Sequence, residues 1–362
     1  MVMNRDFWQG KRVLVTGHTG FKGSWLCLWL ESLGAVVTGY SLAPDSDTNL
    51  FEKAQVENGM SSIIGDLANF ELLNTCFSEQ QPDIVLHLAA QALVRESYTS
   101  PRLTYATNVM GTLNVLEACR ECKSVRAIVL VSTDKCYENK EWHWGYRESD
   151  PLGGHDPYSS SKACMEILTA SYRRSFFNPE TYADHKVAIA TARAGNVIGG
   201  GDWAMDRLVP DTLNAIHNNQ PIALRYPTAI RPWQHVLEPI SGYLTLAENL
   251  YTQGVQCAQA WNFGPAPESA KSVSWITQFL VQHYPANIEI SEDKQAFVHE
   301  AQYLKLDCSQ ANDILKWQAK WDLPTALLKV IEWSKGVQQG EDPRTLCLRQ
   351  INAFEASVED KV

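Results

Sequence analysis

The sequence has 362 residues, of which 45% are hydrophobic, and a formal net charge of −10. This length is sufficient for a large core and more than one domain. The negative charge argues against nucleic acid or an anionic membrane as a partner, and no apolar run approaches the ~20 residues of a membrane span. The nine cysteines are scattered, which is typical of free thiols in a reducing cytoplasm. Cys119 and Cys122 form the only close pair, with no second pair at zinc-ligand spacing, and the histidines show no H-x-x-x-H spacing, so we expect no metal site.

A glycine-rich segment lies near the start of the chain, between an expected strand at residues 11–16 and an apolar, helix-like stretch at residues 24–33. Gly17, Gly20 and Gly23 follow the spacing G-x-x-G-x-x-G. The first glycine permits a tight turn, the second lets the backbone approach a pyrophosphate, and the third allows the helix to pack closely on the strand. Strand, glycines and helix in this order predict a dinucleotide-binding site.

Further strands alternate with helical segments along the chain. We expect them at residues 36–40, 62–66, 83–88, 127–132 and 187–191. Continuous apolar strands separated by helices indicate an α/β fold, a doubly wound parallel sheet of the Rossmann type that is covered on both faces. Ligands then bind at the carboxyl ends of the strands, where Gly17, Asp66, Ala89, Ala90 and Thr133 are expected.

The two expected domains interleave. Residues 1–194 and 229–256 are assigned to the dinucleotide-binding domain. Residues 195–228 and 257–362 are assigned to a smaller C-terminal α/β domain that binds the substrate. Within the second domain, the stretch from Trp317 to Trp333 is predicted to be a packed helix, because Pro324 is suited to a helix start.

An acid–base cluster begins where the strand at 127–132 ends. Thr133, Asp134 and Lys135 come first, and Tyr158 and Lys162 follow at a spacing that places both on one face of a helix. An adjacent ammonium lowers the pKa of a phenol, which can then accept a hydroxyl proton near neutral pH. The added carboxylate and amine exceed what a simple alcohol oxidation needs. The cluster therefore indicates oxidation coupled to a second proton transfer.

In order and spacing, these motifs resemble the extended short-chain dehydrogenase/reductase family and, within it, the nucleotide-sugar 4,6-dehydratases. The resemblance covers residues 8 to 340. The matching segments are residues 16–23, 87–90, 108–112, 132–134, 158–162, 193–196, 231–236, 262–264 and 304–307. Residues 132–137 and 196–203 are similar in particular to dehydratases that act on CDP-glucose. Related 4-epimerases usually carry small residues where this chain has Thr133 and Asp134.

The resemblance implies a role for most of the cluster. Tyr158 would take the proton of the sugar 4-hydroxyl, and Thr133 would bond the 4-oxygen. Lys162 would hold the nicotinamide ribose and lower the pKa of Tyr158. Hydride would leave C4 for NAD, a base would remove the C5 proton, and Asp134 would protonate the departing 6-hydroxyl before hydride returns to C6. NAD is then a bound catalyst, and the product is a 4-keto-6-deoxy sugar nucleotide for deoxysugars of surface polysaccharide such as O-antigen.

Lys135 departs from the dTDP-glucose dehydratases, which have Glu at this position. Lys135 would be the C5 base if its amine can lose its proton. Alternatively, it is an electrostatic residue that stabilises an enolate, and water or another group is the base.

The cofactor-binding residues also follow from the resemblance. They are Gly17, His18, Gly20, Phe21, Lys22, Gly23, Ser41, Asp66, Leu67, Ala89, Ala90, Tyr158 and Lys162. NAD-dependent folds usually end the second strand with an acid that bonds the ribose diol, but this strand ends at Ser41. No Lys or Arg lies between Thr38 and Leu50 to hold a 2′-phosphate, so NAD is expected over NADP, with a weaker grip on the ribose. His18 and Lys22 are the nearest positive candidates.

Substrate contacts are expected from the C-terminal part. Arg207 and Arg231 match positions where the family grips the sugar-nucleotide diphosphate, and Arg suits bidentate phosphate contacts. Asn196 and Tyr226 match sugar-side and base-side contacts.

Three classes of function remain open. The first is a lyase acting on CDP-glucose, dTDP-glucose or UDP-N-acetylglucosamine, since dehydratases of the last substrate also carry Thr-Asp-Lys. The second is a 4-epimerase or simple oxidoreductase of the same fold, which Asp134 and Lys135 disfavour. The third is a non-enzymatic dinucleotide sensor, which has no need to keep Tyr158, Lys162 and Asp134 together. The resemblance further implies a homodimer formed through two sheet-flanking helices, or a homotetramer, and the free cysteines place the expected protein in the cytoplasm.

Overall fold

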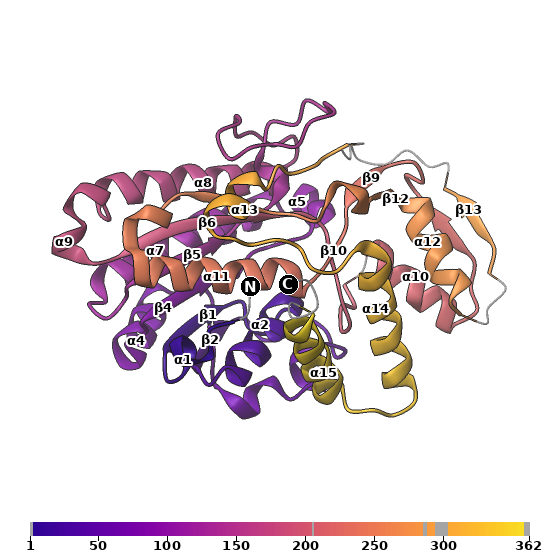
Figure 1. Cartoon of the computed structure of the whole chain (residues 1–362), viewed down its shortest axis with the longest axis horizontal. Helices are drawn as coiled ribbons and strands as arrows, with labels where there is room; N and C mark the ends of the chain where they lie inside the picture. The colour runs from indigo at the N-terminus through magenta and orange to yellow at the C-terminus, as the bar shows by residue number, and fades with distance from the viewer. Residues whose placement is uncertain (1–2, 205, 285–287, 294–302, 358–362) are drawn as a thin grey trace.

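A seven-stranded parallel sheet forms the centre of the molecule, in the order β11-β6-β5-β4-β1-β2-β3 (Figure 1). The structure is a computed structural model that describes residues 3–204, 206–284, 288–293 and 303–357. The strands of the sheet are β1 (Arg12–Thr16), β2 (Val36–Ser41), β3 (Ser61–Ile64), β4 (Ile84–His87), β5 (Ala127–Val131), β6 (Ala188–Ala194) and β11 (Ala260–Phe263). The predicted α/β doubly wound fold is confirmed.

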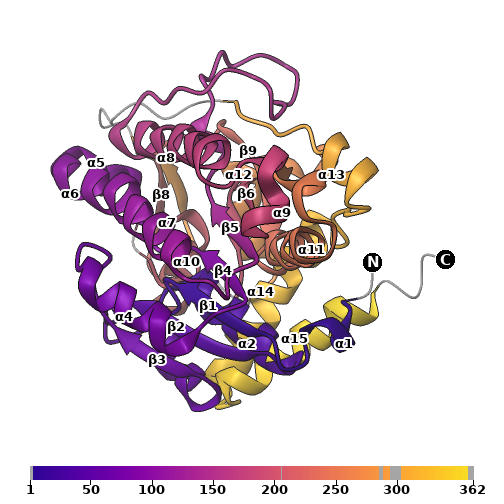
Figure 2. The same cartoon turned by 90° about the vertical axis from the view of Figure 1, so that its left-hand side faces the viewer.

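Helices cover both faces of this sheet (Figure 2). The first face carries α2 (Phe21–Ser32), α11 (Leu237–Gln253) and α15 (Pro343–Ala356). The second face carries α4 (Phe70–Gln80), α7 (Thr112–Glu121) and α8 (Pro157–Ser175). The strands explain why both faces are covered: Val13 and Val15 of β1 belong to the first core, and Leu14 between them belongs to the second. A strand with apolar side chains on both faces needs helices on both.

A smaller unit lies beside the carboxyl end of the sheet, at the right of Figure 1. Its helices are α10 (Leu208–His217), α12 (Val273–Gln282) and α14 (Leu323–Gln338), and they share one hydrophobic core. Its strands pair in twos: β7 (Val197–Ile198) with β10 (Gln234–His235), β8 (Ile222–Leu224) with β13 (Ile290–Glu292), and β9 (Ile230–Pro232) with β12 (Ala270–Ser272). Pro324 lies in the first turn of α14, as predicted, but the helix begins at Leu323 and not at Trp317.

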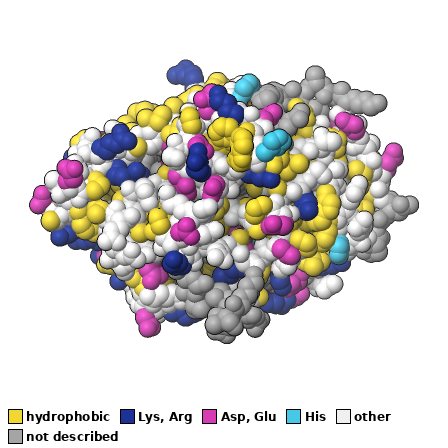
Figure 3. Space-filling model, turned by 45° about the horizontal axis from the view of Figure 1, so that its top comes forward, with side chains coloured by type: hydrophobic (Ala, Val, Ile, Leu, Met, Phe, Trp, Pro, Cys, Tyr) yellow, Lys and Arg dark blue, Asp and Glu magenta, His cyan; other side chains and the backbone are white. Residues whose placement is uncertain are grey.

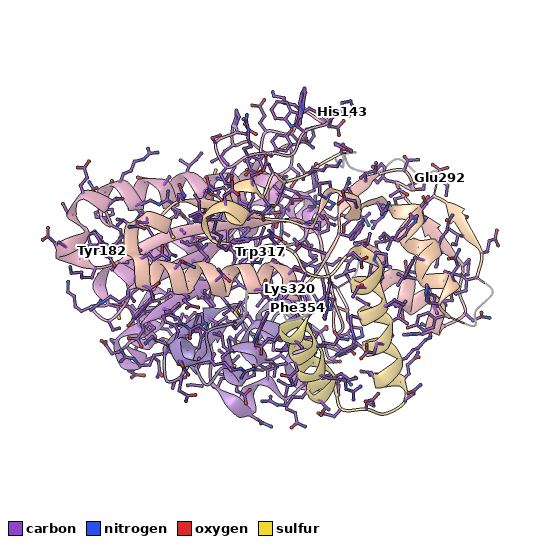
Figure 4. The ribbon with its side chains drawn as sticks, viewed as in Figure 1. His143, Tyr182, Glu292, Trp317, Lys320 and Phe354 are labelled. Carbon is purple, nitrogen blue, oxygen red and sulfur yellow. The ribbon has the colours of Figure 1, made fainter. Side chains whose placement is uncertain are left out.

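Short elements complete the described chain. They are α1 (Arg5–Trp8), α3 (Leu50–Lys53), α5 (Val94–Thr99), α6 (Pro101–Tyr105), α9 (Tyr182–His185), α13 (Ser309–Ile314), a π-helical turn (Ala106–Gly111) and 3-10 turns at Val56–Gly59, Asp134–Cys136, Pro179–Thr181, Gly254–Cys257 and Pro267–Ser269. The loop between β5 and α8 rises above the body of the molecule, with His143 at its outer end (Figure 4). Stacked rings hold it, with centroids 5.1 Å apart for Tyr137 and Tyr146 and 5.0 Å apart for Trp142 and Tyr146.

Two segments correct the predicted division between the domains. Residues 260–263 form β11, which pairs with β6 and closes one edge of the large sheet. Helix α15 packs on the same body, with the ring of Phe354 5.6 Å from that of Trp29. Lys320 and Phe354 also lie side by side in Figure 4, where the Lys320 ammonium donates to the Phe354 carbonyl at 3.2 Å. A four-residue strand gives almost no periodicity, so the sequence pattern does not reveal this return to the sheet. The other boundaries stay a prediction.

The surface carries charges of both signs, spread over the face seen in Figure 3. In the part of the chain that the structure describes, no helix combines the length and apolar character that crossing a membrane requires.

Candidate active site

The glycine loop lies between β1 and α2. Gly17 has a φ of +77°, and a Cβ atom there would lie 2.7 Å from the Ala89 nitrogen. A Cβ atom on Gly23 would lie 2.1 Å from the Gly17 carbonyl oxygen. At Gly20 the nearest atom would be that same oxygen, at 3.4 Å, so this side of the loop is open. The first and third glycines therefore allow tight packing, and the second leaves the N-terminal backbone of α2 accessible to a pyrophosphate.

His18 is a buried residue behind this loop. Its Nε2 atom lies 2.8 Å from the Ser62 hydroxyl, and its ring packs against Phe51 at 5.3 Å. Gly39 makes room for it, since a Cβ atom there would lie 2.2 Å from the ring. Burial lowers the pKa of His18 to about 4. The ring is neutral at pH 7, so the positive charge expected from His18 is corrected, and its place among the cofactor contacts stays a prediction.

Lys22 faces the acid–base cluster. Its ammonium donates to the Tyr243 hydroxyl at 3.3 Å. Burial, followed by the charges of Arg207 and Lys162, lowers the pKa of Lys22 to about 7, and Asp134 opposes this. At pH 7 the amine of Lys22 is therefore only partly charged, and its place among the cofactor contacts stays a prediction. Tyr243 was missed by sequence reasoning, because it lies on the buried helix α11 and reads as core.

The end of β2 carries no charged side chain. Ser41 is 9% exposed, and its hydroxyl lies 3.0 Å from that of Thr19. Asp66, after β3, accepts from the Ala68 nitrogen at 2.9 Å through its carboxylate, and its carbonyl accepts from the Tyr40 hydroxyl at 2.9 Å. The expectation of a weak grip on the ribose rests on this arrangement.

Ser41→Asp is expected to tighten NAD binding by about tenfold, since a hydrogen bond to a charged group contributes ~1.5–3 kcal/mol and the Thr19 contact is lost. Isothermal titration calorimetry measures the dissociation constant of NAD in the variant and in the wild type. NADP should not gain, because the new carboxylate repels a 2′-phosphate. The matched control is Ser46→Asp, which adds the same charge to the following loop. Equal gains for NAD in both variants would contradict the role of position 41.

The 3-10 turn at Asp134–Cys136 presents the acid of the cluster. The Thr133 hydroxyl donates to Asp134 Oδ1 at 3.1 Å and accepts from the Lys135 nitrogen at 3.3 Å. Asp134 is 2% exposed, and its Oδ2 atom accepts no hydrogen bond from any residue that the structure describes. Burial raises the pKa of Asp134, although Lys135, Thr133 and Arg231 oppose the shift. A raised pKa favours the protonated form of a carboxyl, which is the form that can donate a proton as an acid.

Tyr158 and Lys162 lie in the first turns of α8. The helix begins after Asp156, whose side chain accepts from the Ser159 nitrogen at 2.9 Å. Burial raises the pKa of Tyr158 to about 12, and the hydrogen bond with Thr133 and the charge of Arg207 oppose this shift. The predicted lowering of the Tyr158 pKa is therefore wrong.

The reason lies in the direction of the Lys162 side chain. Its ammonium donates to the Val131 carbonyl at 3.0 Å, and burial lowers its own pKa to about 8. The amine is thus held at the end of β5, between the strand and the helix.

A buried ion pair fixes α8 against β6. Arg193 donates to Glu166 through Nε and Nη2, both at 2.9 Å, and the Thr191 hydroxyl adds a bond of 2.7 Å to the same carboxylate. Arg193 also donates to the Tyr137 hydroxyl at 2.8 Å. A buried pair with this many partners is costly to break, so the helix that carries Tyr158 is held rigidly on the sheet.

Two of the predicted substrate residues, Arg207 and Arg231, lie close enough to the cluster for their charges to act on it. Arg207 caps α10 and pairs with Asp202 at 3.0 Å. Arg231 is 6% exposed on β9 and donates to the Ile230 carbonyl at 3.0 Å, and its charge acts on the pKa of Asp134. The carbonyl of Asn196 accepts from Gln234, and that of Tyr226 from Ala229, at 3.2 and 3.1 Å. These bonds do not involve their side chains, whose roles stay a prediction.

Metal ligands do not gather at the cluster or elsewhere in the described residues, where no three His, Cys, Asp or Glu side chains could hold an ion together.

The family follows from a match over most of the chain. A family model described as GDP-mannose 4,6 dehydratase matches residues 14–329. The chain belongs to this family. The match contains the glycine loop, the acid–base cluster and both arginines, and the resemblance to nucleotide-sugar 4,6-dehydratases is confirmed.

Relatives within the GDP-mannose 4,6-dehydratase family agree with this. A CDP-glucose 4,6-dehydratase of Salmonella typhimurium is 50% identical over 353 residues, which is 98% of each chain. A dTDP-glucose 4,6-dehydratase of Streptomyces antibioticus is 28% identical over 89% of this chain and 91% of its own.

Solved structures share the fold. A dTDP-glucose 4,6-dehydratase of Bacillus anthracis in complex with NAD has a TM-score of 0.74 at 20% identity, covering 92% of this chain and 100% of its own. A UDP-glucose 4-epimerase of Stenotrophomonas maltophila with bound NAD has a TM-score of 0.79 at 21% identity, covering 91% and 99%.

Proposed function

We propose that the protein is an NAD-dependent lyase that converts CDP-glucose into CDP-4-keto-6-deoxyglucose and water. The observation that carries this is the buried carboxyl of Asp134, one residue from Thr133 and in the same electrostatic field as Tyr158. An oxidation of the 4-hydroxyl needs only the tyrosine. A second, buried carboxyl in the cluster, whose pKa is raised above its ordinary value, supports a reaction in which water is also lost. The Salmonella relative at 50% identity supports CDP-glucose as substrate.

The residues of the glycine loop fit NAD. When NAD is bound, it would supply the chemistry of accepting and returning hydride. Gly20 leaves the backbone open toward a pyrophosphate, and no positive side chain is placed at Ser41 to favour a 2′-phosphate. Lys162 would hold the nicotinamide ribose from its position at the end of β5.

The first proton transfer belongs to Tyr158. Its phenol would accept the 4-hydroxyl proton, with Thr133 bonding the same oxygen. The raised pKa means that the phenol starts protonated, so it becomes a base only as substrate and cofactor add their own charges and hydrogen bonds to the site.

The second transfer belongs to Asp134. Its carboxyl would give its proton to the 6-oxygen as the C6–O bond breaks. Lys135 would remove the C5 proton, or would stabilise the resulting enolate while another group acts as the base. Arg207 and Arg231 would bind the diphosphate, which the two guanidinium groups suit by charge and geometry.

A labelling experiment tests this reading. CDP-glucose deuterated at C4 should yield product with deuterium in the C6 methyl group, and solvent hydrogen should enter at C5. The site must keep the reactive intermediate and hydride together, away from water, until the hydride returns. Mass spectrometry and NMR of the product locate the label. Deuterium retained at C4 would indicate an epimerase, and release as free reduced cofactor would indicate a simple dehydrogenase.

The same assay distinguishes substrates. Separate incubations with CDP-glucose, dTDP-glucose and UDP-N-acetylglucosamine should give the highest kcat/KM for CDP-glucose. A clear preference for either of the others would leave the reaction unchanged and correct the substrate.

We also propose a cellular compartment and an oligomeric state for the enzyme. All nine cysteines are free thiols, which supports a reducing cytoplasm. Exposed apolar side chains on the sheet-flanking helices, including Leu103, Met110 and Ile167 at 56%, 54% and 58% exposure, support a homodimer or homotetramer formed through that face. The product would feed deoxysugar synthesis for surface polysaccharide such as O-antigen.

A further inference from the structure

Asp206 joins the two parts of the molecule. Its Oδ1 atom accepts from Arg95 of α5 at 2.6 Å and from Arg225, directly after β8, at 2.9 Å. Arg225 also donates to the Asp206 carbonyl at 3.3 Å. One carboxylate thus bridges a helix of the sheet-containing body and a strand end of the smaller unit.

The helix at one end of this bridge is connected to the catalytic tyrosine. Asn108 donates to the carbonyl of Gln91 at 3.0 Å and to the Ser161 hydroxyl at 2.8 Å. Ser161 in turn donates to the Tyr158 carbonyl at 2.7 Å. Gln91 Oε1 accepts from the nitrogen of Leu93, the residue before α5, at 2.5 Å.

Two residues of this hydrogen-bond network are buried in the core. Asn108 is 1% exposed and Ser161 is fully buried. Asn108 lies in the π-helical turn, a feature that often marks functional sites. The position of α5 is therefore set by the same polar groups that hold the start of α8.

The centre of the bridge, Asp206, lies next to a predicted substrate-binding residue in the chain. Asp206 precedes Arg207, the N-cap of α10, and has a φ of +63°. This left-handed backbone is uncommon for a residue with a side chain and needs support from its surroundings. The two arginines supply that support through the carboxylate and the carbonyl. Arg207 is separately held by Asp202 at 3.0 Å.

We propose that Arg95 is a positioning residue for the nucleotide-sugar diphosphate, acting through Asp206 to hold Arg207 in register with Tyr158. The proposal rests on the proposed function, in which Arg207 binds that diphosphate. Arg95 and Asp206 do not themselves touch substrate in this arrangement.

The size of the effect follows from exposure. The side chains of Arg95 and Asp206 are each 47% exposed, and that of Arg225 is 25% exposed. Exposed ion pairs contribute little individually, and salt screens them. We therefore expect a loss of affinity of about threefold to tenfold from breaking the bridge, and a smaller loss at 1 M salt, where the Debye length is about 3 Å.

The test measures the affinity for CDP by calorimetry, and kcat and KM with CDP-glucose, in the NAD-loaded full chain. Arg95→Gln and Asp206→Asn should each weaken CDP binding and raise KM by about threefold to tenfold, with kcat within about twofold. The double variant should be no weaker than Asp206→Asn, because both changes remove one interaction. Arg95→Lys should restore most of the affinity, since the contact uses one nitrogen. The control is Arg349→Gln, which removes an exposed pair with Glu341 at 2.5 Å on the far helix α15.

Each other outcome has a definite meaning. Tighter CDP binding by Asp206→Asn, with weaker binding by Arg95→Gln, would make Arg95 a direct phosphate ligand and overturn the positioning role. Unchanged affinity in both variants would also overturn it. Arg207→Gln separates this from the proposed function: if Arg207→Gln leaves CDP affinity unchanged, the diphosphate role of Arg207 fails. If only Arg207→Gln weakens CDP binding, that role stands and the bridge fails.

Discussion

Tyr158→Phe is expected to lower kcat by about 10²–10⁴-fold, the typical contribution of a general base. The phenol hydroxyl is the group proposed to take the 4-hydroxyl proton, and phenylalanine keeps the ring while removing it. Substrate affinity should stay within a few fold, because the proposed diphosphate contacts come from Arg207 and Arg231. Steady-state turnover of CDP-glucose, with calorimetry for affinity, gives both values.

A control on the same helix separates chemistry from folding. The Tyr172 hydroxyl donates to Glu117 at 2.7 Å, more than three turns from Tyr158, so Tyr172→Phe should lose some stability and keep kcat. In the wild type, the raised pKa of Tyr158 predicts that kcat/KM increases with pH above neutrality, and this increase should vanish in Tyr158→Phe. Near-normal turnover in that variant would remove Tyr158 from the mechanism.

Asp134→Asn is expected to allow oxidation at C4 and to block the loss of water, again by about 10²–10⁴-fold for the dehydration step. The amide keeps the shape and can still accept the Thr133 bond, but it cannot supply an acidic proton to the 6-oxygen. A single-turnover experiment should show the absorbance of the reduced cofactor rise and persist. Failure of the initial absorbance rise would place Asp134 in the first step. Asp150→Asn, in the loop after β5, is the matched control.

Stability gives an independent check on the same variant. The folded-state pKa of Asp134 lies above its unfolded value, so its contribution to stability is complete at low pH and is lost as pH rises through the folded pKa. Asparagine does not ionise, so the variant does not lose this stability as the pH rises. Asp134→Asn should therefore unfold at the same or a higher temperature than wild type at pH 7, and the difference should shrink as the pH falls below the ordinary range of carboxyl groups.

Local patterns in the sequence were enough to predict most of the fold. Each expected strand of the sheet lies within a few residues of an observed one, because a buried parallel strand is a continuous apolar run. The glycine loop was equally clear, since its φ value and close contacts can be met only by glycine at positions 17 and 23.

Relations between distant segments could not be predicted in the same way. The burial of His18 depends on the space left by Gly39, and the contact of Lys22 depends on Tyr243 of a helix that follows much later. The direction of Lys162 toward the Val131 carbonyl depends on how closely α8 packs on β5. Sequence spacing can place two residues on one face of a helix. The groups on other elements that these residues contact are set by tertiary packing.

The return of the chain to the sheet has a consequence for biosynthesis. Because β11 pairs with β6, the edge of the sheet stays open on the ribosome until residue 263 has emerged, after the first half of the smaller unit. Helix α15 then covers Trp29 only when residues 343–356 have been made. An N-terminal fragment ending after β6 would expose an unpaired strand edge, a feature that promotes aggregation. The nascent chain therefore depends on β11 to pair with the open edge of the sheet and on α15 to cover the helix that follows the glycine loop.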